Sequence, residues 1–416
     1  MFRSMRLLSK LFASIGTIYT IAVILLFATV ADQPLGRLGY LPINPTLCAL
    51  SLLSPFALRS IARGLILRSP DLALAPLLKN GLPFAGFFLI AITSLAFSAL
   101  PTAHWMEGGK WIFLISYGFC ISTLAAFVPS GLHFQRLFVT AAIMTLGLLL
   151  WSMIYDINYP GAFAELDARA AGFPGNANFT ALVAVMVCAS ALNYSHGKAL
   201  ARNIVLFVAT GAIVVTSMSR SGALNFVFLI GVFSYVRLAA NGWRPREVVN
   251  VFATGSVIVL SCFAIAMIAS STGAISKQSR LYRLMNRQQV DDGSAASRLF
   301  AVKESLRLID ESPVLGHGTG FSRTMAELPH NLYLQQWVNN GIFGLVSLGL
   351  FLLASLYTFT ERRYPPGQAL ILVTILGGAF SHNILDQRPF LILFGILLEL
   401  SRQTSPAMAR YASVAL

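Results

Sequence analysis

The feature that most constrains the fold is a series of long apolar segments. About twelve stretches of roughly 20 mostly apolar residues follow one another, and this is the length that an α-helix needs to cross a bilayer. They lie near residues 12–31, 40–58, 81–99, 111–129, 135–154, 178–194, 203–218, 222–238, 248–271, 332–357, 368–383 and 389–402. Only 11% of the 416 residues are charged, against about 25% in a soluble domain. The sequence therefore predicts an all-α polytopic membrane protein, with residues 1–416 forming a single transmembrane domain of about 12 transmembrane helices.

The distribution of Lys and Arg predicts the orientation of these helices, because cytoplasmic loops carry an excess of positive charge. With the N-terminus inside, the cytoplasmic segments hold 17 of the 30 Lys and Arg residues, and eight of the other 13 fall in the segment 272–330. Long loops translocate regardless of charge, so we expect both termini in the cytoplasm. The net charge of +14 is scattered between apolar runs, which favours anionic lipid and not nucleic acid as its partner.

Two segments on the outer side are long enough to carry polar chemistry. They are residues 155–177, between the fifth and sixth predicted helices, and residues 272–330, between the ninth and tenth. Within the longer one, Ser297 to Asp310 has a helical pattern, with Ser297 as its cap and Pro313 after its end. Its predicted apolar side consists of Leu299, Phe300, Val302 and Leu306, and its polar side of Glu304, Arg307, Asp310 and Glu311. We expect an amphipathic helix near the membrane surface.

Arginines of the predicted outer side are candidates for binding phosphate groups. Arg280, Arg283 and Arg287 follow one another at i, i+3 and i+7, so a helix would place them on one face. Arg169 lies in the segment just before the sixth predicted helix, and Arg220 at the tip of the hairpin between the seventh and eighth. The planar guanidinium binds pairs of phosphate oxygens and keeps its charge, which suits a pyrophosphate. The alternative is that these side chains only extend to lipid headgroups.

His330 is the candidate catalytic residue that the sequence favours. It lies between Pro329 and Asn331, at the start of a helix whose polar residues Gln335, Gln336, Asn339 and Asn340 recur every three or four positions. That stripe faces either the protein or a cavity, and an imidazole there can take a proton from a hydroxyl. The alternative is a polar interfacial residue or a helix cap. His317 and His382 have no comparable surroundings and are weaker candidates.

Metal and cofactor sites are not indicated by the sequence. The four cysteines lie within apolar runs, and the outer acidic residues form no metal-binding constellation. Phosphate-binding loops, dinucleotide fingerprints and the common hydrolase motifs are absent from the sequence. We therefore expect neither a cofactor nor a metal.

The region around His330 resembles the signature of the O-antigen ligase and polymerase superfamily. The family pattern is an Arg, a Pro-x-x-Gly-x-Gly turn, then His-Asn-x-x-Leu and Gly-x-x-Gly-Leu. The corresponding segments here are SRLF at 297–300, SPVLGHGTGF at 312–321, PHNLYL at 329–334 and GIFGL at 341–345. Two earlier motifs of the family are matched by Arg169…Gly172…Asn176-Ala-Asn178-Phe and by Ser219-Arg220-Ser-Gly222. Ala177 stands where the family often has proline, and Phe300-Ala301 where many members carry an aromatic residue slightly later.

The resemblance implies a metal-independent GT-C glycosyltransferase that works at the periplasmic face of the bacterial inner membrane. Its donor would be an O-antigen glycan on undecaprenyl pyrophosphate, and its acceptor a sugar hydroxyl of lipid A–core. His330 would orient or deprotonate that hydroxyl, with inversion at the anomeric carbon. The pyrophosphate would be bound by Arg220, Arg280 and Arg287, helped by Arg169 and Arg298. Asn331, Arg283 and Asn178 would support the site.

Two other functions stay open on the sequence alone. One is an O-antigen polymerase, whose acceptor is a second lipid-linked repeat unit. It is less favoured, because polymerases more often have two sizeable outer loops. A relative that glycosylates Ser or Thr of a protein is also less favoured, because such members are often longer than this chain. The other is a transporter or flippase of a lipid-linked glycan, which needs polar residues near the middle of the bilayer. The polar residues here gather at one predicted face, which favours the ligase.

Overall fold

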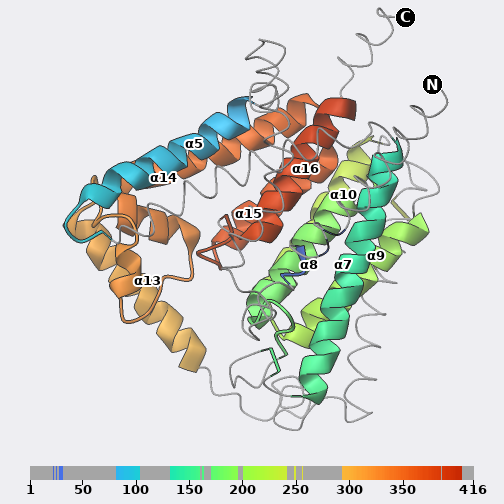
Figure 1. Ribbon diagram of the computed structural model, residues 1–416, viewed down its shortest axis with the longest axis horizontal. Coiled ribbons are helices and arrows are strands. Elements are labelled where there is room, and N and C mark those ends of the chain that lie inside the picture. The colour runs from blue at the N-terminus through green and yellow to red at the C-terminus, as the bar shows by residue number, and fades with distance from the viewer. Residues whose placement is uncertain are drawn as a thin grey trace, which may run out of the picture.

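The computed structural model describes residues 81–103, 132–159, 162–163, 170–194, 200–240, 293–385 and 387–404, with the isolated positions 22, 25, 28–30, 248–249 and 255. This part of the chain is helical and contains no strand (Figure 1). Its elements in order are α5 (Gly81–Ala96), η1 (Phe97–Ala99), α7 (Leu132–Asn158), α8 (Ala177–Ala191), α9 (Leu200–Ser217), α10 (Arg220–Ala240), α13 (Gly293–Glu311), η2 (Phe321–Thr324), α14 (Leu332–Glu361), α15 (Pro365–Gly378) and α16 (Arg388–Thr404).

Five helices within the described ranges are long and apolar enough to cross a membrane. They are Gly81–Ala99, Gln135–Asn158, Leu200–Ser217, Arg220–Ala239 and Leu332–Glu361, so five of the predicted membrane helices are confirmed as apolar helices of spanning length. The predicted spans 178–194, 368–383 and 389–402 are present as the shorter helices α8, α15 and α16. The spans predicted at 12–31, 40–58, 111–129 and 248–271 lie outside the described residues, apart from a few isolated positions.

The short helix α8 forms the centre of the larger bundle. It packs against α7, α9, α10, α15 and α16, and its side chains are buried on every side from Thr180 to Ala191. A helix that is apolar all round belongs in an interior. With 15 residues it extends about 22 Å, which is less than the hydrocarbon thickness of about 30 Å. Helix α8 alone is therefore too short to cross the hydrocarbon layer, and its N-terminal residues Asn178 and Phe179 line a pocket.

The second unit is an antiparallel pair made by α5 and α14 (Figure 1). Gly86 allows the two backbones to approach, since a Cβ atom there would lie 2.7 Å from the Cα atom of Phe351. Further along, the rings of Phe97 and Phe343 lie 6.0 Å apart. Close contact through small residues is the usual way in which helices associate in lipid.

Helix α14 is broken at Gly341, where φ is 60° and ψ is −156°. The connection after α13 enters this break. The amide N–H of His317 donates to Val338 O at 2.9 Å and that of Gly318 to Asn339 O at 2.8 Å. In return, Ile342 N–H donates to Pro313 O at 3.1 Å. The backbone groups that the break releases are thus satisfied by the connection, which is fixed to the helix.

The polar stripe of α14 faces the protein. Asn339 Oδ1 accepts a hydrogen bond from Ser322 N–H at 2.9 Å. Asn340 Oδ1 accepts one from the Thr319 hydroxyl at 2.7 Å, and its amide donates to Gln336 Oε1 at 3.1 Å. Of the two alternatives for this stripe, the protein-facing one therefore holds, and these amides anchor the connection that leads to His330.

Helix α13 lies on the N-terminal part of α14, where Leu308 and Ile309 pack on Val338. It begins four residues before the predicted cap Ser297, because Ser294, Ala295 and Ala296 continue the helix. The predicted apolar side is exposed, and the side that packs on the protein contains the small residues Ala301 and Ser305.

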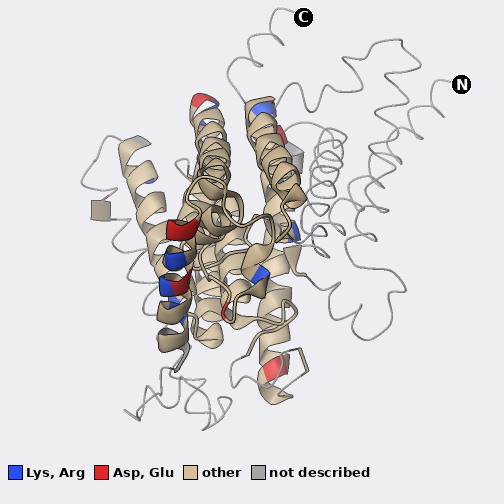
Figure 2. Ribbon diagram, turned by 90° about the vertical axis from the view of Figure 1, so that its left-hand side faces the viewer, with Lys and Arg blue, Asp and Glu red and all other residues tan. Residues whose placement is uncertain are grey.

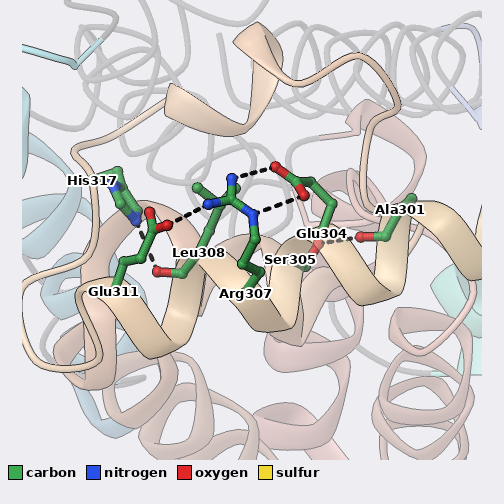
Figure 3. A network of polar contacts seen from close by, with 7 residues as sticks. All are labelled: Ala301, Glu304, Ser305, Arg307, Leu308, Glu311 and His317. Carbon is green, nitrogen blue, oxygen red and sulfur yellow. Dashed lines mark hydrogen bonds and ion pairs between the residues drawn. The ribbon is translucent and has the colours of Figure 1, made fainter.

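The outer side of α13 is charged. Alternating acidic and basic positions distinguish it from the mostly uncharged spanning helices in Figure 2. Arg307 is ion-paired with Glu304 and with Glu311, and His317 Nε2 lies 2.8 Å from Leu308 O (Figure 3). The His317 ring also stacks on Phe321. His317 is thus part of the structure that holds α13 to the connection.

Candidate functional site

Four helices begin around one pocket, and a fifth ends there. The pocket has a volume of about 190 Å³. Its lining comes from the first turns of α8 and α10, from the residues just before α14 and α16, from the end of α15, and from α13. The lining residues are Pro174, Asn176, Asn178, Phe179, Leu182, Ser221, Asn225, Arg298, His330, Gly377, Phe380, Ser381, His382, Asn383 and Gln387. Segments far apart in sequence, from 174 to 387, therefore share one site.

Asparagine and serine caps fix the starts of three of these helices. Asn176 Oδ1 accepts from the N–H groups of residues 178 and 179 at the start of α8. Asn331 Oδ1 accepts from those of residues 333 and 334 at the start of α14. The hydroxyl of Ser219 accepts from Gly222 N–H at 3.0 Å at the start of α10. Such caps satisfy the free N–H groups of a first turn, so Asn331 supports the site by fixing the helix that follows His330.

The segment before α8 is held against the end of α7. The buried carboxylate of Asp156 accepts hydrogen bonds from the N–H groups of Ala171, at 2.8 Å, and Gly172, at 3.3 Å. Gly172 has a φ of 61°, and a Cβ atom there would lie 2.5 Å from Ser152 Oγ. These contacts fix the backbone at Gly172, and the residues that follow it, Pro174 and Asn176, therefore reach the pocket.

His330 is an exposed residue of the pocket lining, and its imidazole is available to a ligand. Neither ring nitrogen hydrogen-bonds to another described residue, and the His382 ring lies 5.6 Å away between centroids. Partial burial lowers the pKa of His330, and the positive charge of Arg298 lowers it further, while Glu327 acts in the opposite direction. The ring is therefore neutral at pH 7, as a proton acceptor must be.

The pocket favours an anion next to His330. Arg298 is half-buried in its lining. Arg220 is the first residue of α10 and is exposed, and its neighbour Ser221 lines the pocket. The N-terminal end of each helix carries a partial positive charge, and here four such ends converge. Their effect adds to that of the arginines.

The structure brings together three of the predicted site residues, His330, Arg298 and Asn178. Arg220 is adjacent to the pocket without being part of its lining. Arg169, Arg280, Arg283 and Arg287 lie outside the described residues, so their proposed roles remain predictions. Within the described part of the chain, no group of three or more His, Cys, Asp or Glu side chains is placed to hold a metal ion.

Several pocket residues were not selected from the sequence, among them Asn225, His382, Asn383 and Gln387. Asn383 and Gln387 belong to the polar connection between α15 and α16, which breaks the apolar pattern and was the signal available for that region. The sequence favoured His382 less than His330, and the two are 52 positions apart in sequence, so only the packing of α15 reveals that their rings are neighbours. Asn225 lies within an apolar helix that gives no local signal.

The fold and the pocket define a polytopic helical membrane protein with a polar, anion-favouring site at one end of its helices. Residues 205–349 match the family model for O-antigen ligase. This match covers His330, Arg220 and Arg298, and it confirms over that region the resemblance found in the sequence. It supports assignment of the chain to the O-antigen ligase family. No curated protein matches the chain.

Proposed function

We propose that this protein is an O-antigen ligase, which transfers the O-antigen glycan from undecaprenyl pyrophosphate to a sugar hydroxyl of lipid A–core at the periplasmic face of the inner membrane. The observation that carries this proposal is the pocket in which an imidazole without hydrogen bonds to the described residues, His330, lies beside Arg298 and the starts of four helices. Such a set can activate a hydroxyl and stabilise an anionic leaving group without a metal ion.

In the proposed reaction, His330 accepts the proton of the acceptor hydroxyl as its oxygen attacks the anomeric carbon. The bond from that carbon to the pyrophosphate oxygen breaks, and undecaprenyl pyrophosphate leaves with the bonding electrons. Arg298 and Arg220 would stabilise the charge that develops on the leaving group, together with Arg169, Arg280 and Arg287. A single displacement inverts the configuration of the anomeric carbon.

The test is transfer by the purified protein in nanodiscs, with lipid-linked O-antigen and lipid A–core as substrates and EDTA present. We expect lipid A–core carrying the glycan as product. His330→Ala should lower the rate by about 10²–10⁴-fold, which is the typical contribution of general base catalysis. Arg298→Gln should also lower it, whereas the matched control Lys303→Gln removes a positive charge from an exposed position of the same helix and should not.

The products of the same assay separate the two alternatives. A polymerase would lengthen the lipid-linked glycan when lipid A–core is omitted, and a flippase would release no undecaprenyl pyrophosphate. The ligase proposal would be contradicted if folded protein lengthened the lipid-linked glycan in this way or released no undecaprenyl pyrophosphate. It would also be contradicted if His330→Ala transferred glycan at the wild-type rate.

A further inference from the structure

The floor of the pocket holds a buried polar group without a hydrogen-bond partner in the described part of the chain. Asn225 is 1% exposed, and its Oδ1 atom makes no hydrogen bond there. Its Nδ2 atom donates to the carbonyl oxygen of Ser221 at 2.9 Å. Because a carbonyl can only accept, the NH₂ edge of the amide must face Ser221. The unsatisfied edge is therefore the acceptor.

This acceptor faces the pocket. Asn225 lies one helical turn beyond Ser221 on α10, and both residues belong to the lining. A Cβ atom built on Gly377, which also lines the pocket, would lie 3.7 Å from Asn225 Oδ1, so the acceptor is on the side of α10 that borders the pocket. A buried acceptor without a donor is unfavourable, and such groups in a pocket are typical of a site that awaits a ligand.

The chemistry of this acceptor selects the ligand that can bind there. A pyrophosphate linked to lipid presents only acceptor oxygens, so it cannot satisfy Asn225 Oδ1. A sugar hydroxyl supplies the missing donor. The neighbouring lining is also suited to hydroxyls, because Asn178, Asn383 and Gln387 carry amides that both donate and accept.

We infer that the part of the pocket formed by Asn225, Asn178, His382, Asn383 and Gln387 is a sugar-binding subsite, in which Asn225 Oδ1 accepts a hydrogen bond from a sugar hydroxyl. The inference rests on the proposed function and assigns a substrate group to one part of that site. Two sugars could supply the hydroxyl: the terminal sugar of the acceptor, or the first sugar of the donor glycan.

The test uses Asn225→Leu in the nanodisc transfer assay, with KM measured separately for the donor and for lipid A–core. The loss of one hydrogen bond is expected to raise KM by about tenfold for the substrate whose hydroxyl binds there. The thermal stability of the ligand-free protein should stay equal or rise, because the substitution removes an unsatisfied buried acceptor. A residue with a purely structural role would not give this combination.

Asn203→Leu is the matched control. Asn203 is also 1% exposed, but its amide is satisfied on both edges by the backbone of Asn193, at 3.0 and 2.8 Å, at the end of α8 away from the pocket. We expect this variant to lose stability without a change of either KM. If Asn225→Leu behaves in the same way, or leaves both KM values unchanged, the inference is wrong.

The proposed function and the sugar subsite can fail independently. If the wild-type protein transfers no glycan, the proposed function is wrong, but the subsite can still be tested by binding. In that case binding is measured by the thermal shift that the free core oligosaccharide or the free O-antigen repeat unit gives with His330→Ala protein. The sugar subsite predicts a shift that disappears when Asn225→Leu is added, and no shift from either oligosaccharide overturns it.

Discussion

The break in α14 offers a quantitative test of how the site is held. Replacing Gly341 by Ala places a side chain at a φ of 60°, and its Cβ atom would lie 2.0 Å from Val314 O. The backbone strain is about 1–2 kcal/mol. The overlap also forces the connection out of the break, which removes the hydrogen bonds from His317 and Gly318 to α14 and the one from Ile342 to Pro313 O, each worth about 1 kcal/mol.

These contributions sum to roughly 4 kcal/mol, equivalent to a loss of roughly 5–10 °C in Tm. The matched control is Gly349→Ala in the same helix, where a Cβ atom would have no neighbour within 4 Å. Since Ala is the better helix former by about 1 kcal/mol, that variant should be as stable as wild type or slightly more so.

The assay heats detergent-solubilised fluorescent fusions of the variants and measures the monodisperse fraction that remains at each temperature. A Gly341→Ala protein that melts with wild type and Gly349→Ala would show that the connection is not held by the break. The same result would remove the reason for expecting His330 to be rigidly placed.

Three further outcomes are expected. Because the pKa of His330 is lowered below its ordinary value of 6.5, kcat/KM should stay constant as the pH falls through 6.5 and decline only at lower pH. Glu327→Gln removes the charge that raises this pKa and should move the decline to still lower pH. A wild-type decline centred at or above pH 6.5 would contradict this. His382→Ala should lower kcat/KM by about tenfold or more through loss of a substrate hydrogen bond, and unchanged kinetics would exclude this residue from the site. Asn331→Ala should lower stability by about 1 kcal/mol through loss of the α14 cap, measured as Tm, whereas Asn331→Asp should restore it.

Local sequence pattern was sufficient to predict the spanning helices that the structure describes. Apolar length alone located α5, α7, α9, α10 and α14, because each carries its signal within its own residues. Their ends were less well predicted. Helix α14 continues to Glu361 and α7 to Asn158, since helices extend beyond the apolar part of their sequence as long as no residue stops them.

The sequence predicted that α13 is amphipathic but left open which of its sides packs against the protein. Its large apolar residues indicated an apolar side, yet Leu299 is 56% and Phe300 is 53% exposed while Ala301 and Ser305 are buried. In a membrane protein, large apolar side chains suit a lipid-facing surface and small ones suit helix contacts. Hydrophobicity therefore did not indicate which side faces the protein.

The pocket could be predicted only in part. His330 and Arg298 belong to one continuous motif, so they could be selected from the sequence. Asn225 and His382 join them through the packing of α10 and α15, which are separated from that motif by long stretches of chain. Contacts of this kind depend on tertiary structure, which no local pattern contains.

The order in which the lining is synthesised has a consequence for the cell. The walls from α8 and α10 are made early, but the pocket lacks one side until Gly377 to Gln387 have emerged and α16 has been inserted. Since chains fold from the N-terminus during synthesis, a partly inserted protein would hold His330 next to an open wall. Under the proposed function, we expect such an intermediate to transfer no glycan until α16 has been inserted.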